Sequence, residues 1–152
     1  MANTLTPPLK VVLFSGGSGT ASISDALQKY PDIELTSLVN AYDDGKSTGL
    51  LRRFIPGMLG PSDVRKVVSS LLKHRTDRSS TALRLLLEYR LPDSITAETA
   101  IELLSQLAAL APADLNSHEL LIAKEGLSLE QARLVSKYLT AFLSSTATPF
   151  PS

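Results

Sequence analysis

The sequence predicts an α/β protein: a Rossmann-like β-α-β unit at the N-terminus, followed by a helical region. Three observations lead to this. A short apolar segment leads directly into a glycine-rich segment at residues 15–20, and a second segment rich in β-forming residues occupies 33–40. From residue 61 onward, apolar residues recur at helical spacing. We therefore expect a phosphate- or nucleotide-binding part in residues 1–75 and a helical region of the same domain in residues 76–152.

The first half fits a parallel β-α-β unit. The continuous apolar run 9–14 is typical of a strand buried on both faces. A helix is expected over 21–30, with Pro31 and Asp32 ending it, and the next strand over 33–40. A connection of this length implies parallel strands with right-handed connectivity.

Helices are expected in the second half from Pro61 onward, and then at 80–90, 97–110, 117–125 and 129–143. The run Ser128 to Gln131 has the pattern of a capping box, in which the first and fourth residues bond each other's backbone N–H. Apolar residues recur at helical spacing, and these stripes are interpreted as core. The two clearest stripes are Val64, Val67, Val68, Leu71 and Leu72, and Leu134, Val135, Tyr138, Leu139 and Phe142.

Two strands alone do not make a stable parallel sheet, which needs cover on both faces. No third strand is evident after residue 40. We therefore expect an incomplete parallel sheet, with the chain forming the N-terminal part of a longer protein that is truncated at its C-terminal end. The alternative is that a partner chain completes the sheet.

The composition limits the function classes. The 15 basic and 15 acidic residues cancel, so no overall field favours nucleic acid or an anionic membrane, and neither partner is expected. Cysteine is absent, which excludes disulfides and thiolate metal sites and is in keeping with a cytoplasmic location. His74 and His118 lie far apart in the sequence and are interpreted as solvated helix residues.

The segment Ser15–Thr20 favours phosphate binding, because glycines let a ligand approach backbone N–H groups closely. Ser22 stands where a dinucleotide fingerprint has its third glycine, and no Lys-Ser/Thr pair follows, so neither that motif nor a Walker A loop is present. The alternative is a plain tight turn.

The second segment, residues 40–49, follows the second strand, where open α/β sheets place their ligands. Asp43 and Asp44 could hold Mg²⁺ through their oxygens, or one could act as a general base. The alternative is a turn, since Asp-Asp-Gly is good turn chemistry. Gly45-Lys46-Ser47 imitates the end of a P-loop, but Asn40 stands where its first glycine should be.

The third segment is basic and leads into a helix. Arg52 and Arg53 supply forked donors suited to phosphate. Ser62 and Asp63 lie at the expected helix start, a second place for an anion, although helix capping explains Asp63 equally well.

In this order, the three segments resemble the CofD-like superfamily. It contains 2-phospho-L-lactate transferases and the YvcK-type gluconeogenesis factors, which bind nucleotide sugars. The matching text is residues 14–20, then Val39-Asn40 with 43–53, then 60–66. The Asp-Asp-Gly-x-Ser-x-Gly-x-Leu-Arg-Arg spacing and the Gly-Pro-x-Asp-x-Arg element are closer to the YvcK-type branch.

The resemblance implies a Rossmann-like fold with a nucleotide, nucleotide diphosphate or nucleotide sugar across the strand ends. Asp43 and Asp44 would be catalytic or bind Mg²⁺, with no covalently bound cofactor, and a homodimer or a regulatory protein partner is expected. The implied ligand-binding residues are Gly16, Gly17, Ser18, Gly19, Thr20, Asn40, Ser47, Arg52, Arg53, Ser62, Asp63 and Arg65.

Three functions remain open at this point. The chain is a transferase acting on a nucleotide-diphosphate-activated substrate, a non-catalytic regulator of carbon or cell-wall metabolism that binds a UDP-sugar, or a helical interaction module. Two departures from the family pattern bear on the choice. The later strands with a Gly-Asn element are missing, and the middle segment differs from the transferase pattern, which puts a phospholactate substrate in doubt.

Overall fold

The computed structural model describes residues 7–16, 19–42, 45, 48–49, 52–53, 57, 59–110, 115 and 117–146. The chain divides into two compact units, Met1–Arg75 and Thr76–Ser152. Among the described residues, no helix combines the length and apolar character that crossing a lipid bilayer requires.

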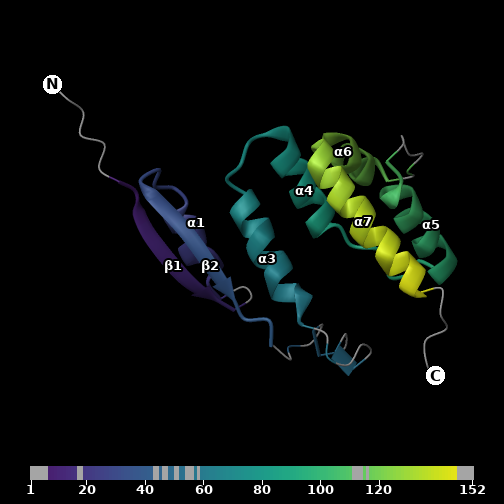
Figure 1. The fold of residues 1–152 in the computed structure, drawn as a ribbon, viewed down its shortest axis with the longest axis horizontal. Coiled ribbons are helices and arrows are strands. Elements are labelled where there is room, and N and C mark those ends of the chain that lie inside the picture. The colour runs from purple at the N-terminus through teal and green to yellow at the C-terminus, as the bar shows by residue number, and fades with distance from the viewer. Residues whose placement is uncertain are drawn as a thin grey trace. The chain divides into compact units, whose positions relative to one another are not determined.

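The first unit contains the predicted β-α-β arrangement (Figure 1). Strands β1 (Leu9–Ser15) and β2 (Ile33–Val39) pair in parallel, from Leu9 opposite Ile33 to Ser15 opposite Val39. Helix α1 (Ala21–Leu27) joins them. It ends at Leu27 and not at Tyr30, because the chain tightens there: Tyr30 N–H donates to the Leu27 carbonyl at 3.2 Å.

One face of this sheet is covered and the other is open. Helices α1 and α3 (Pro61–Leu72) contact β2 and each other, and alternate strand residues such as Val11 and Leu35 are half-buried. On the opposite face Val12, Phe14 and Leu38 are 55%, 78% and 47% exposed. The expectation of a strand buried on both faces is therefore wrong for β1: both helices of the unit pack against the same face.

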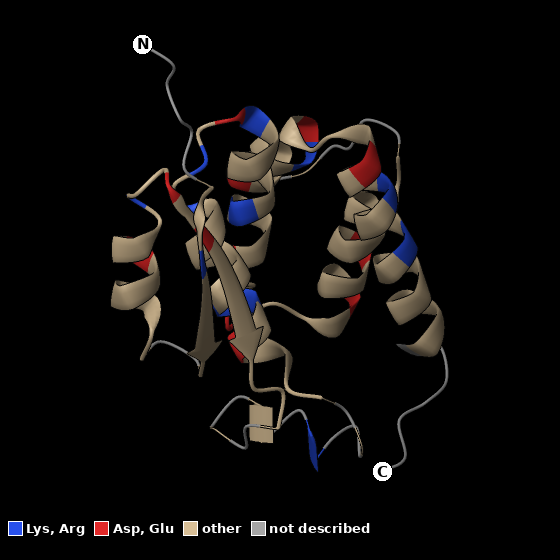
Figure 2. Cartoon of the chain, turned by 60° about the vertical axis from the view of Figure 1, so that its left-hand side comes forward, with Lys and Arg blue, Asp and Glu red and all other residues tan. Residues whose placement is uncertain are grey.

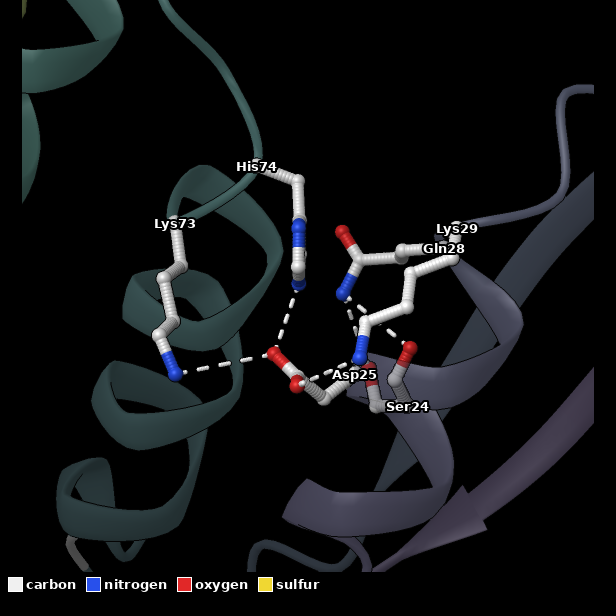
Figure 3. A network of polar contacts seen from close by, with 6 residues as sticks. All are labelled: Ser24, Asp25, Gln28, Lys29, Lys73 and His74. Atoms are coloured by element: carbon white, nitrogen blue, oxygen red, sulfur yellow. Dashed lines mark hydrogen bonds and ion pairs between the residues drawn. The ribbon is translucent and has the colours of Figure 1, made fainter.

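A polar network links α1 to the end of α3 (Figure 3). The Asp25 carboxylate lies 2.6 Å from His74 Nε2 and 3.6 Å from Lys73 Nζ, while Lys29 Nζ lies 3.8 Å from its other oxygen. The His74 hydrogen bond, more than the nearby lysines, holds the pKa of Asp25 below its usual value. His74 is thus a partner of Asp25 and not merely a solvated residue. The network ties α1 to the end of α3.

The second unit is helical. It consists of α4 (Arg78–Glu88), α5 (Ala97–Ala108), α6 (His118–Gly126) and α7 (Leu129–Thr146). Helix α4 packs beside α6, and α5 beside α7. The buried residues Leu107, Leu115 and Leu120 form its core cluster. Figure 2 shows acidic and basic residues interspersed along these helices.

The helix starts follow the sequence signals. Asp77, Thr96 and Ser117 cap α4, α5 and α6, each accepting a backbone N–H with its side chain. The predicted capping box at the start of α7 is confirmed. Ser128 N–H donates to Gln131 Oε1 at 2.9 Å, and Gln131 N–H donates to Ser128 Oγ at 3.2 Å. These local patterns therefore set where the helices begin.

The prediction that the apolar stripes are core is only partly right. In α7, Val135 and Leu139 are half-buried, but Leu134, Tyr138 and Phe142 are 48%, 65% and 48% exposed. Val64 in α3 is also exposed, at 41%. The stripes are wider than the contact that one neighbouring helix provides, so their outer residues face solvent.

Candidate functional site

The carboxyl ends of the two strands meet at one edge of the sheet. Ser15, the last residue of β1, is buried, and its carbonyl accepts the N–H of Asn40 at 3.2 Å, just beyond the end of β2. This bond continues the pairing past both strands. It places the beginning of the glycine segment beside residues 40–42, at the edge where open α/β sheets bind ligands.

Residues 40–42 are held by three further hydrogen bonds. Asn40 Oδ1 accepts from Tyr42 N–H at 3.0 Å, so the side chain folds the backbone into a tight turn. Arg52 NH1 donates to the Tyr42 carbonyl at 3.2 Å, and Gly60 N–H donates to the Ala41 carbonyl at 2.8 Å. Parts of all three segments singled out in the sequence therefore converge at this one edge.

The fold does not require glycine at two positions of the loop. Among the described residues, a Cβ atom built on Gly16 would meet nothing within 4 Å beyond its chain neighbours, and one on Gly19 would lie 3.8 Å from the Gly16 carbonyl, an ordinary contact. Neither residue has the left-handed backbone conformation that favours glycine. Space beside the backbone of this kind is what a closely approaching phosphate needs.

Thr20 occupies the N-cap position of α1, but its side chain makes no capping hydrogen bond. Its hydroxyl is therefore not used to start the helix. Helix α1 has only 7 residues, so its dipole adds little to anion binding. A phosphate at this position would therefore depend on backbone N–H groups of the glycine segment more than on the helix.

The basic segment and the start of α3 complete the edge. Arg52 is half-buried and Arg53 is exposed. Gly60 is the N-cap of α3, so Asp63 does not cap the helix but lies in its first turn. There it is buried and forms an ion pair with Lys66 at 3.2 Å. Ser62 and Arg65 are half-buried on the same helix.

Two hollows lie next to these residues. One, of about 460 Å³, opens at the strand ends and is lined by Phe14, Ser15, Gly16, Leu38, Val39 and Asn40. The other, of about 110 Å³, lies between the end of β1 and helices α1 and α3. Its lining includes the hydroxyl residues Ser15, Thr20, Ser24 and Ser70 and the Lys66 side chain. Lys66 belongs to a matched motif, but the sequence did not single it out as a site residue.

Several predicted site residues lie outside the described part of the chain: Gly17, Ser18, Asp43, Asp44 and Ser47. The assignment of Asp43 and Asp44 to Mg²⁺ or to catalysis therefore stays a prediction. Among the residues that are described, no three His, Asp or Glu side chains gather as a metal site would need.

A comparison with protein families shows which family the chain belongs to. A family model described as "2-phospho-L-lactate transferase CofD" matches residues 11–133. This match covers most of the sequence, and the chain belongs to the CofD family.

Curated proteins to which the chain is similar carry the name gluconeogenesis factor, in keeping with the resemblance to the YvcK-type branch that the motifs indicated. The gluconeogenesis factor of Listeria monocytogenes is 40% identical over 62 residues, which are 41% of this chain and 19% of that protein. The gluconeogenesis factor of Bacillus subtilis is 31% identical over 80 residues, 47% of this chain and 25% of the relative.

A protein of Thermoanaerobacterium thermosulfurigenes whose name also includes gluconeogenesis factor is 34% identical over 86 residues, 57% of this chain and 24% of its own length. The chain thus spans about a quarter or less of the relatives it matches. No solved structure matches it.

Proposed function

We propose that the edge formed by the strand ends binds the phosphate groups of a nucleotide or nucleotide sugar. The observation that carries this proposal is the convergence of Ser15, residues 40–42, Arg52 and Gly60 through the hydrogen bonds described above. Gly16 and Asn40 both line the hollow at the strand ends, and Arg52 is hydrogen-bonded to the nearby Tyr42 carbonyl. Backbone N–H groups and guanidinium donors are the usual protein ligands of phosphate.

In this proposal the role is regulatory: the protein binds a UDP-sugar in the cytoplasm and influences carbon or cell-wall metabolism through a partner protein. The names of the curated relatives support this choice, since they are gluconeogenesis factors. It predicts tight, saturable binding with the ligand released unchanged.

A second candidate is transfer of a phosphorus-containing group from a nucleotide-diphosphate-activated substrate. The description of the matching family model favours it. Asp43 or Asp44 would then serve as general base or Mg²⁺ ligand, and Arg52 and Arg53 would stabilise phosphate charge. Mg²⁺ would neutralise the diphosphate when bound. If the chain turns over the nucleotide substrate and Asp44→Asn abolishes this turnover, the function is transfer and not regulation.

The test is calorimetric titration with UDP-N-acetylglucosamine, GDP and NADP, each with and without Mg²⁺, on the unmodified chain and on Gly16→Ala. Because the added methyl meets no atom of the described residues beyond its chain neighbours, the thermal unfolding of this variant should match that of the unmodified chain. A bound phosphate, in contrast, would lose its close approach to the backbone.

We expect one nucleotide to bind and Gly16→Ala to weaken it at least tenfold. If the variant binds that nucleotide as tightly as the unmodified chain, the ligand does not approach the loop and the proposed site is wrong. If no nucleotide binds to the folded chain, residues 1–152 do not contain the site.

A further inference from the structure

The hollow at the strand ends has an apolar wall and a polar rim. Phe14 is 78% exposed and Leu38, directly across the sheet from it, is 47% exposed. Both belong to the open face of the sheet. At the carboxyl end of the strands the same hollow is bordered by Gly16 and Asn40.

This hollow is continuous with the proposed phosphate site. Gly16 and Asn40 belong to both, so a nucleotide whose phosphates lie at Gly16 can extend its nucleoside, ribose first and then the base, into the hollow that Phe14 lines. The volume of about 460 Å³ falls within the roughly 300–1,000 Å³ that is typical of small-molecule sites. The lining is also of the usual kind, an apolar surface with a few polar groups at one side.

The polar rim offers a hydrogen-bond donor. The Asn40 side-chain oxygen is used by Tyr42 N–H, which turns the carboxamide NH₂ away from that bond. Within the described part of the chain, this NH₂ group donates no hydrogen bond. A ring carrying a carbonyl oxygen or a ring nitrogen at its edge would provide the acceptor.

We propose that this hollow holds the nucleobase of the bound nucleotide, stacked on the Phe14 ring with its edge toward Asn40. The inference rests on the proposed function and adds a residue that the family motifs do not mark as a ligand. A planar base suits the site because a flat aromatic face accepts any base, whatever its hydrogen-bonding pattern. Phe14 then sets affinity, and Asn40 contributes to the choice of base.

The experiment compares nucleotide with a ligand that has no base. The tightest-binding nucleotide from the titration above and inorganic pyrophosphate are titrated into the unmodified chain, Phe14→Ala, Phe14→Tyr and Val12→Ala. Val12 is the matched control, because it lies on the same open face, is 55% exposed and does not line the hollow. Thermal unfolding of each variant is measured alongside.

We expect Phe14→Ala to weaken nucleotide binding by about 5- to 140-fold, the range that base–aromatic stacking supports. Pyrophosphate binding should be unchanged, and Phe14→Tyr and Val12→Ala should bind the nucleotide normally.

Two results would overturn the inference and leave the phosphate site standing. One is nucleotide binding by Phe14→Ala at unmodified strength. The other is an equal loss for nucleotide and pyrophosphate, which would mean that Phe14 only supports the loop. Failure of both ligands to bind the unmodified chain would instead contradict the proposed function itself.

Discussion

Asp77 illustrates how much a single side chain does at a helix start. Its carboxylate accepts the backbone N–H of Ser80 at 2.8 Å and the hydroxyl of Ser79 at 2.9 Å. The hydrogen bonds from Ser80, followed by the one from Ser79, lower the pKa of Asp77 from 3.8 to about 2. The ionised form of this residue is therefore favoured in the folded protein.

The shifted pKa predicts how stability depends on pH. The folded state binds the Asp77 proton more weakly than the unfolded state does. The contribution of ionised Asp77 to folding stability is therefore complete above about pH 4 and is lost as the pH falls toward 2. Between pH 6 and pH 2, the midpoint temperature of thermal unfolding should therefore fall more steeply for the unmodified chain than for Asp77→Asn. The asparagine keeps an acceptor oxygen at the cap but does not titrate. Parallel curves would contradict this account of α4.

At the residue scale, the sequence predicted what depends on close neighbours. The Ser128–Gln131 capping box is such a case, since both partners lie within one helical turn. It could not predict the Asp25–His74 hydrogen bond, whose partners are separated by 49 positions and meet only when α1 packs on α3. The sequence also could not predict that Asn40 turns the chain by accepting the Tyr42 N–H, because this hydrogen bond depends on the backbone conformation.

Helices α4 and α6 are packed closely where Gly126 meets Ala82. Both residues are buried, and a Cβ atom on Gly126 would lie 2.6 Å from the Ala82 Cβ. That atom cannot rotate away, so the backbones would have to separate. Glycine is required here by space, in contrast to Gly16.

Gly126→Ala should therefore lower the free energy of unfolding by about 1–3 kcal/mol, the usual cost of overpacking. Alanine's better helix propensity offsets at most about 1 kcal/mol of this. Urea denaturation checks the value, with Gly16→Ala as the control that should stay within about 0.5 kcal/mol of the unmodified chain. A stabilised Gly126→Ala protein would show that the two helices can separate freely.

At the element scale, hydrophobic periodicity predicted which segments form helices and strands but not which of their residues are covered. The spacing of Leu134, Tyr138 and Phe142 correctly indicated a helix. Their exposure depends on how much of α7 the neighbouring helices reach, which no local pattern contains. Phe14 is a parallel case in β1: an apolar run predicts a strand, and its cover depends on the rest of the fold.

For the molecule as a whole, the sequence predicted the β-α-β unit, the helical region and the family. The three motifs that indicated the family each lie at a strand end or a helix start. Hydrogen bonds bring parts of all three together in the structure. The balanced charge of 15 basic and 15 acidic residues gives no long-range attraction for an anionic ligand. The proposed binding therefore depends on local donors around Gly16, Asn40 and Arg52.

Amide chemical shifts would show where a nucleotide binds, and the proposed place is the strand ends. Two-dimensional ¹H–¹⁵N spectra of the labelled chain would be recorded while UDP-N-acetylglucosamine, or the nucleotide that calorimetry selects, is added. We predict that the largest shifts fall on the amides of Gly16, Asn40 and Gly60, with little change in residues 76–152. Saturating shifts confined to the helical unit, or no shifts at all, would contradict the account.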